Sequence, residues 1–228
     1  AGVYISVGTL RANVGASLTP NATHLVRVDS QHESVEFGRM DTDFLRLARS
    51  KEDLVWLMKS ATMEEIKTRV NATQTHEDIG FPKDSLITNS HYLLWFRQIL
   101  RYQGYRLLFA GQENSEADYA YKGANYLHSD QLFDRPSKLA KAGKIANIQI
   151  DLSDLNSVVQ LVQELKRLKL AISVFDMSDT WYSSEKIKFL SPQSSAALMT
   201  DLKAAAHPDG IVLMTSWFSS DGESYDLI

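Results

Sequence analysis

The chain has 228 residues, of which 44% are hydrophobic and 23% charged, an ordinary composition for a globular protein. It contains no cysteine, which excludes disulfides, thiolate zinc sites and cysteine nucleophiles from this sequence, and no apolar run reaches the ~20 residues of a membrane-spanning helix. The formal net charge is −4 and Lys and Arg are scattered among Asp and Glu, so we expect no basic face and no nucleic acid as the main partner.

Five segments have the pattern of β-strands. Residues 3–7 and 24–28 are rich in β-branched residues that alternate with others, and 145–150 is a third short run. Residues 171–175 and 211–215 are nearly continuous apolar runs, as a sheet covered on both faces requires. Strands that alternate with helices predict an α/β fold with an open parallel sheet in strand order 3-2-1-4-5 and helices on both faces.

The second half of the chain supplies two clear crossover helices. Residues 152–169 form an apolar stripe at helical spacing, with Ser153 or Asp154 as the N-cap. Residues 191–206 follow, with Pro192 at the first helical position. Residues 207–210 should end this helix and turn into the last strand, after which we expect no further strand.

The segment between the second and third strands is too long for one crossover. We expect residues 31–120 to form a large helical insertion within a single domain that spans 1–228, and to lie as a cap near the mouth of a ligand pocket. Thr62 with Glu65 is a capping box, and Ser50 with Asp53 resembles one. The predicted helices of this region are 41–49, 50–59, 62–70, 90–103 and, before the third strand, 129–144 with a restart at Pro136; residues 105–111 form a candidate extra strand.

A glycine and three acidic residues stand where the predicted strands end. Gly8 follows the first strand, Asp29 ends the second, Asp151 follows the third and Asp176 follows the fourth. Ligands of open parallel sheets bind beyond the carboxyl ends of the strands, at the point where the strand order reverses. There Asp29 could accept hydrogen bonds from a ribose diol, Asp151 could accept them from an adenine amino group, and Gly8 would let the backbone approach the ligand.

The same residues have a structural explanation. Asp and Ser follow strands because they cap the next helix, and a single glycine can be a turn residue. Three other kinds of site lack their motifs. The first loop has neither the G-x-G-x-x-G of a dinucleotide site nor the G-K-[ST] of a P-loop, and the chain has no G-x-S-x-G hydrolase motif. None of the six histidines has H-E-x-x-H spacing, so we expect no metal site.

The order of these features resembles the class I S-adenosylmethionine-dependent methyltransferases. The resemblance covers residues 3–30 and 121–217, and it rests on "VGTLRANVG", "YLHSDQLFDRPSKLAKAGKIANIQIDLSD" and "ISVFDMSDTWY". Within that family the chain is similar to a bacterial group with poorly defined substrates. The resemblance implies a soluble Rossmann-like fold, S-adenosylmethionine as the cofactor, and an unidentified small molecule or protein as the methyl acceptor.

The resemblance also implies roles for individual residues. The residues that would bind the cofactor are Gly8, Thr9 and Asn13 at the methionine end, Asp29 and Ser30 at the ribose, Asp151 and Leu152 at the adenine, and Asp176 and Ser178 after the fourth strand. The candidates for catalysis or for the acceptor site are Asp176, Asp179, Trp181 and Tyr182.

A second interpretation is a non-catalytic interaction protein that keeps the fold and binds partners through the helical insertion. It is favoured by the first loop, where Ser6 and Leu10 stand at positions that are usually an acid and a second glycine in the family. The ordered acids Asp29, Asp151 and Asp176 oppose it. We expect a cytoplasmic location, with secretion left open because a leader could precede residue 1, and the oligomeric state is not predicted.

Overall fold

The computed structural model describes residues 2–74, 85–101, 125–152, 154–177, 192–217 and 223–227. The chain divides into two compact units: one contains 1–12, 21–35 and 146–228, and the other contains 13–20 and 36–145. Helices α1 (Thr9–Leu18) and α2 (His32–Leu47) each begin in the first unit and continue into the second. Among the described residues, no helix is both long enough and apolar enough to cross a membrane.

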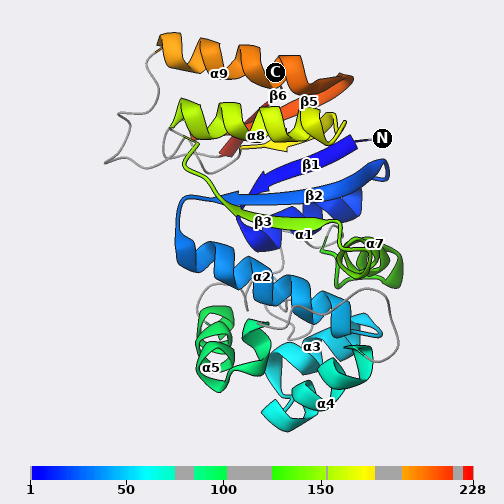
Figure 1. Ribbon diagram of the computed structural model, residues 1–228. Coiled ribbons are helices and arrows are strands. Elements are labelled where there is room, and N and C mark those ends of the chain that lie inside the picture. Colours follow the sequence, from blue (N-terminus) through cyan, green and yellow to red (C-terminus); the bar gives the residue numbers. More distant parts are fainter. Residues whose placement is uncertain are drawn as a thin grey trace. The chain divides into compact units, whose positions relative to one another are not determined.

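The first unit is built on a six-stranded sheet in the order β3-β2-β1-β4-β5-β6 (Figure 1). The five parallel strands confirm the predicted order 3-2-1-4-5 and the α/β, Rossmann-like fold. The strands are β1 (Gly2–Val7), β2 (Ala22–Asp29), β3 (Ile145–Gln149), β4 (Ile172–Asp176), β5 (Ala206–Trp217) and β6 (Glu223–Leu227).

β6 pairs antiparallel with β5, so the prediction of no strand after the fifth is wrong. Its sequence, ESYDL, lacks the apolar run that marks the central strands. An edge strand is paired on one side only and can be held mainly by backbone hydrogen bonds, which composition does not reveal.

The connections place helices on both faces of the sheet. The order reverses between β1 and β4, so right-handed crossovers on the two sides of this point lie on opposite faces. α8 (Leu155–Arg167) and α9 (Pro192–Ala205) therefore share one face, and α1 starts on the other. Asp154 is the N-cap of α8, as predicted, and accepts a hydrogen bond from Asn156 N at 3.1 Å.

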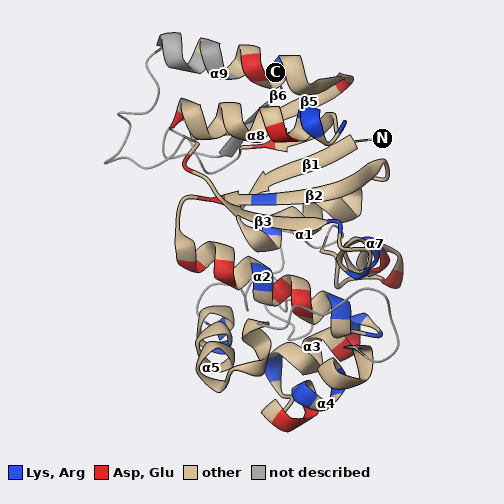
Figure 2. Ribbon diagram, in the orientation of Figure 1, with Lys and Arg blue, Asp and Glu red and all other residues tan. Residues whose placement is uncertain are grey.

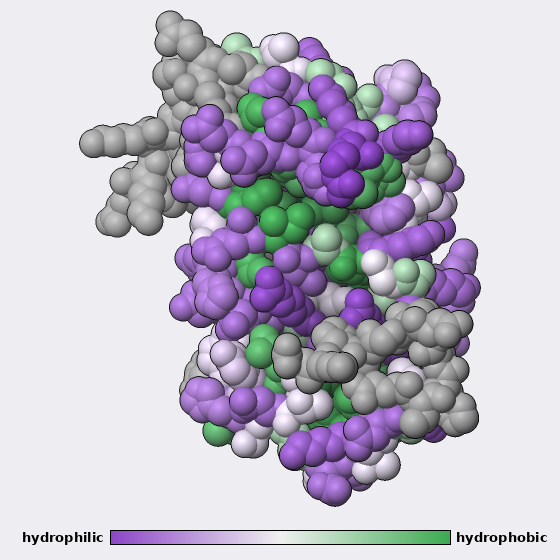
Figure 3. Space-filling view, viewed as in Figure 1, coloured by the Kyte–Doolittle hydropathy of each residue, from purple (hydrophilic) through white to green (hydrophobic). Residues whose placement is uncertain are grey.

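The main apolar core of the first unit lies between the sheet and α8 and α9. Val3 and Ile5 of the central strand β1 are completely buried in it, together with Val158 of α8 and Leu202 of α9. Figure 3 shows apolar surface beside this helical layer, where some hydrophobic residues are only partly buried. Figure 2 shows that the strands carry few charged residues, as their apolar sequences predict.

β5 begins earlier than predicted, at Ala206 instead of Ile211. Ile172 pairs with Ala206 and Val174 pairs with Ile211, so the four residues 207–210 lie opposite the single residue Ser173 and interrupt the register at the predicted turn. A Cβ on Gly210 would lie 2.8 Å from the carbonyl oxygen of Ile172, which explains the glycine at this position.

The second unit is helical in its described residues, which confirms a helical segment between β2 and β3. Phe96 stacks on Phe37 with ring centroids 4.5 Å apart and packs at 5.0 Å against Phe44 in its core. Residues 75–84 and 102–124, including the candidate strand at 105–111, lie outside the described residues. The other helices are α3 (Lys51–Lys59), α4 (Met63–Gln74), the short 3-10 helix η1 (Leu86–Thr88), α5 (Ser90–Ile99) and α7 (Asp130–Lys141).

The predicted capping patterns are present at α3 and α4. Glu65 N donates to Thr62 Oγ1 at 3.3 Å and Thr62 N donates to Glu65 Oε2 at 2.7 Å, which is a complete capping box. At α3, Ser50 Oγ accepts from Asp53 N, but the Asp53 carboxylate accepts from Arg49 N, one residue before the cap.

The structure departs from the predicted helices most clearly at α7 and α2. α7 runs without a restart from Asp130, capped by Ser129, and Pro136 lies inside it, buried. α2 begins at His32, nine residues before the predicted start at 41. Its early turns bury Val35, Phe37 and Met40, an apolar spacing that the charged residues between them obscured.

Candidate functional site

A single residue, Gly8, joins the end of β1 to the start of α1. Its φ is +78°, a conformation that favours glycine, and its N–H donates to the carbonyl oxygen of Val28 at 3.3 Å. A Cβ at this position would have no atom within 4 Å, so the glycine is required by the backbone conformation and not by crowding. The turn therefore presents bare backbone at the carboxyl end of the central strand, next to Thr9.

Asp29 ends the neighbouring strand, β2, and its side chain is half-buried. Its Oδ1 accepts a hydrogen bond from Gln31 N at 3.0 Å, and α2 begins one residue later. This local turn is what the structural explanation of Asp29 predicts. A carboxylate has about four acceptor positions on its two oxygens, so one backbone bond leaves capacity for a ligand.

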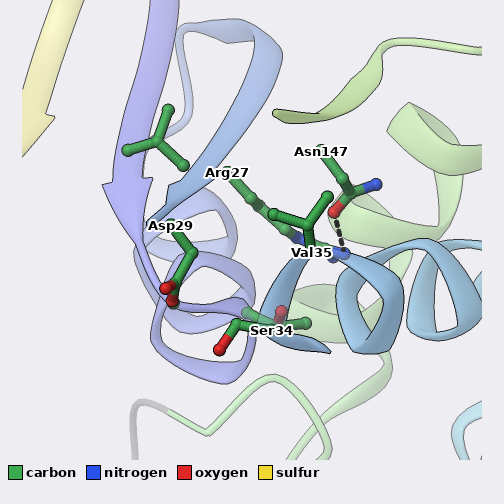
Figure 4. A pocket seen from close by; sticks show the side chains of 8 residues that line it. Arg27, Asp29, Ser34, Val35 and Asn147 are labelled. Carbon is green, nitrogen blue, oxygen red and sulfur yellow. Dashed lines mark hydrogen bonds between the residues drawn. The ribbon is translucent and has the colours of Figure 1, made fainter. Parts of the chain in front are cut away.

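Gly8 and Asp29 line the same hollow, which we call the Gly8–Asp29 hollow (Figure 4). Its cavity volume is only about 10 Å³, within a larger depression of about 180 Å³ that is open to solvent. That is room for about one water molecule, or for the hydroxyl edge of a sugar, but not for a whole nucleoside. The lining residues are Gly8, Thr9, Arg27, Val28, Asp29, Ser34, Val35 and Asn147.

Three polar lining residues were not predicted from the sequence: Arg27, Ser34 and Asn147. Arg27 is only 3% exposed, and its Nη1 donates to Asn147 Oδ1 of β3 at 3.3 Å, the dashed bond in Figure 4. A charged residue inside the apolar run "HLVRVD" was the signal that could have marked it, because buried charges are rare unless they are paired or functional. The hollow thus carries one cation and one anion.

Asp176, at the end of β4, lies in a buried polar row across the sheet and not in the lining of the hollow. Ser6 of β1 is in register with Arg27 on one side and with Asp176 on the other. Asp176 Oδ2 accepts from Tyr4 Oη at 3.1 Å and from Ser6 Oγ at 3.5 Å. Tyr4 therefore makes the shorter bond to this carboxylate, since the single Ser6 hydroxyl proton also has the carbonyl oxygen of Val7 within reach at 3.3 Å.

The other predicted cofactor residues within the described chain also lie outside the lining of the hollow. Asn13 belongs to the second unit, is fully buried, and donates from Nδ2 to Asp41 Oδ2 at 3.0 Å. Leu152 is buried in the apolar core of the first unit. Ser30 and Asp151 are exposed, and their carbonyl oxygens accept from Gln149 Nε2 and Asp154 N, respectively.

The remaining predictions fall on residues outside the described part of the chain, namely Ser178, Asp179, Trp181 and Tyr182. Within the described part, no group of three or more His, Asp or Glu residues is placed to hold a metal ion. Of the predicted site residues, the structure brings Gly8, Thr9 and Asp29 together in the lining of the Gly8–Asp29 hollow.

Comparison with known proteins adds no family to this picture. No model of a known protein family matches the chain, and no curated protein matches it. A functional assignment therefore depends on the site itself.

Proposed function

We propose that the protein is an S-adenosylmethionine-dependent methyltransferase whose Gly8–Asp29 hollow receives the ribose of the cofactor. One observation carries the proposal: a bare glycine turn and a carboxylate, 21 positions apart in the sequence, line one hollow at the carboxyl ends of adjacent parallel strands. β1 is also the strand at which the sheet order reverses, the usual ligand position in such folds.

The size of the hollow limits what it would hold. The hollow has room for the two ribose hydroxyls, which would donate to the Asp29 carboxylate, while the rest of the cofactor would extend past the strand ends. Gly8 would let the ligand approach the backbone, since no Cβ stands there. When bound, S-adenosylmethionine supplies an electrophilic methyl group, and the protein's task is mainly to orient donor and acceptor for an in-line displacement.

The second candidate function is a non-catalytic interaction protein with the same fold. The specific observations in its favour are the small volume of the hollow and the hydrogen bond from Gln31 N to the Asp29 carboxylate. In this case Asp29 is only the cap of the turn between β2 and α2.

Thermal unfolding with and without ligand separates the two functions. A ligand at 100 times its Kd stabilises by about 2.7 kcal/mol, which for a chain of this size raises the Tm by roughly 5–10 °C. We expect such a shift with S-adenosylmethionine and S-adenosylhomocysteine, and none with methionine alone. A shift with NAD instead would assign the hollow to another nucleotide, and no shift with any of them would favour the interaction protein.

A further inference from the structure

β3 is an edge strand of the sheet, and within the described part of the chain no strand pairs with its outer side. Its sequence, IANIQ, contains no charged residue, no proline and no glycine. Natural sheets protect their exposed edges with charges, proline or bulges, because an unprotected edge pairs readily with another strand. The opposite edge strand, β6, has two acids in its sequence, ESYDL. β3 is therefore the edge of this sheet that lacks charged residues.

The backbone of β3 directs hydrogen-bonding groups outward. Ile150 N, directly after the strand, donates to the carbonyl oxygen of Asp29 at 2.9 Å, so the backbone groups of Ile150 face into the sheet. Along a strand, the backbone groups of successive residues point to opposite sides. Those of Gln149 and of Ile145 therefore face away from the sheet. A second extended strand is the partner that such groups fit.

Apolar surface accompanies this edge. Ala146 is exposed, and Ile148 is only partly buried against the core of the first unit. Alternate residues of a strand share one face, so both side chains lie on the face that α8 covers. Figure 3 shows apolar surface at the place where β3 runs in Figure 1. A strand added at this edge would bury apolar side chains together with the backbone groups.

The charges that flank β3 have opposite signs at its two ends. Lys144 directly precedes the strand, Asp151 follows it by two residues, and both are exposed. Antiparallel pairing of two copies brings the Lys144 end of one to the Asp151 end of the other, whereas parallel pairing would bring like charges together. The edge is thus complementary to itself in the antiparallel direction, as a two-fold axis requires.

We propose that two copies of the chain form a reversible dimer by antiparallel pairing of their β3 strands. Pairing over the whole strand places Ile145 of one copy opposite Gln149 of the other and joins the two sheets into one. Five residues make a short interface, so the dimer dissociates on dilution. This interface is independent of the function proposed for the Gly8–Asp29 hollow.

Sedimentation equilibrium of the full chain over a range of protein concentrations tests the proposal. We expect the mass to rise with concentration from 25.7 kDa to twice that value. Hydrogen exchange at the amides of Ile145 and Gln149 should slow as the dimer forms. Ala146→Lys places a charge on the exposed edge, as natural edge strands do, and should leave the protein monomeric.

An exchange of charges tests the direction of pairing. Lys144→Glu brings two acids together at each end of the dimer and Asp151→Lys brings two bases together, so each variant alone should dimerise about tenfold more weakly. An equal mixture of the two should recover the dimer, because each end then has one acid and one base. The matched control is Lys203→Glu, an exposed residue of α9, which connects β4 and β5 away from β3; it should dimerise like the wild type.

The Tm of each variant shows whether it is folded, and should Ala146→Lys not fold, the mixture of charge variants remains the test. A wild type that keeps the monomer mass at every concentration, or assembles beyond a dimer, overturns the proposal. The same holds if folded Ala146→Lys dimerises as tightly as the wild type, or if the mixture is no more dimeric than its two components.

Discussion

Tyr4 is the residue whose structural role can be tested most simply. Its hydroxyl donates to the buried Asp176 carboxylate at 3.1 Å, and hydrogen bonds to charged groups contribute about 1.5–3 kcal/mol. Tyr4→Phe keeps the ring and removes this donor, so we expect the free energy of unfolding in urea to fall by about that amount. The control is Tyr92→Phe, at a half-buried ring packed edge-on against its neighbours, which should change stability by less than about 0.5 kcal/mol. Equal effects in the two variants would contradict the role of the Tyr4–Asp176 bond.

At the scale of single residues, the sequence predicted those site residues that stand at the ends of strands. Gly8 and Asp29 follow from where two strands stop, and adjacent parallel strands bring such ends together. Arg27 and Asn147 were not predicted, since which face of a strand is polar depends on what packs against it. Asn13 was expected at the cofactor but is bonded to Asp41, a long-range pairing with no local signal.

At the scale of elements, the capping box of α4 offers a test with two readouts. The backbone N–H of Thr62 and then its hydroxyl donate to Glu65 and lower the pKa of that carboxyl. Thr62→Ala removes the hydroxyl that caps the helix and should cost about 0.5–2 kcal/mol of unfolding free energy, the usual range for an N-cap. NMR titration of Glu65 should show its pKa move back toward 4.5. An unchanged pKa would show that the hydroxyl does not contribute to it.

Asp43 links α2 to the segment before η1 and should make stability depend on pH. Burial raises its pKa above 3.8, and the bonds from Ser85 Oγ, at 2.5 Å, and from Arg46 only partly oppose this. The folded protein then binds more protons than the unfolded chain between pH 3.8 and the raised pKa. Its unfolding free energy therefore falls as the pH rises through that window.

Asp43→Asn should remove this contribution. We expect the variant to lose part of the downward slope of unfolding free energy with pH just above 3.8, measured by urea unfolding at a series of pH values. Asp134→Asn, an exposed acid on α7 paired with Lys138, is the control. If both variants keep the wild-type slope, burial of Asp43 is not its source.

The elements that the sequence predicted well have strong local signals. Apolar runs gave β1, β2 and β4, and capping residues gave α3, α4 and α8. β6 was not predicted, because an edge strand can be held mainly by backbone hydrogen bonds, which composition does not reveal. The start of β5 at Ala206 was not predicted, because it depends on pairing with Ile172 of β4. Pro136 lies within a helix because the packed surroundings of α7 outweigh its local cost.

At the scale of the whole molecule, the fold class and the strand order were predicted from the five strand runs and the helical segments between them, and the structure confirms both. The division of the chain into units was not predicted from the sequence. The chain has two compact units, and their boundaries run through α1 and α2, where no change of composition marks them. The position of residues 31–120 as a cap beside the pocket stays a prediction.

The central claim is that the Gly8–Asp29 hollow receives the ribose hydroxyls of S-adenosylmethionine, and calorimetric titration with S-adenosylhomocysteine tests it most directly. Asp29→Ala should weaken the affinity about ten- to a hundredfold, since hydrogen bonds to charged groups contribute about 1.5–3 kcal/mol. Asp29→Asn, which keeps the shape and some bonding, should lose less. Asp154→Ala, which removes the exposed N-cap of α8, should leave the affinity unchanged. Wild-type affinity in Asp29→Ala, or no binding by the wild type, would contradict the claim.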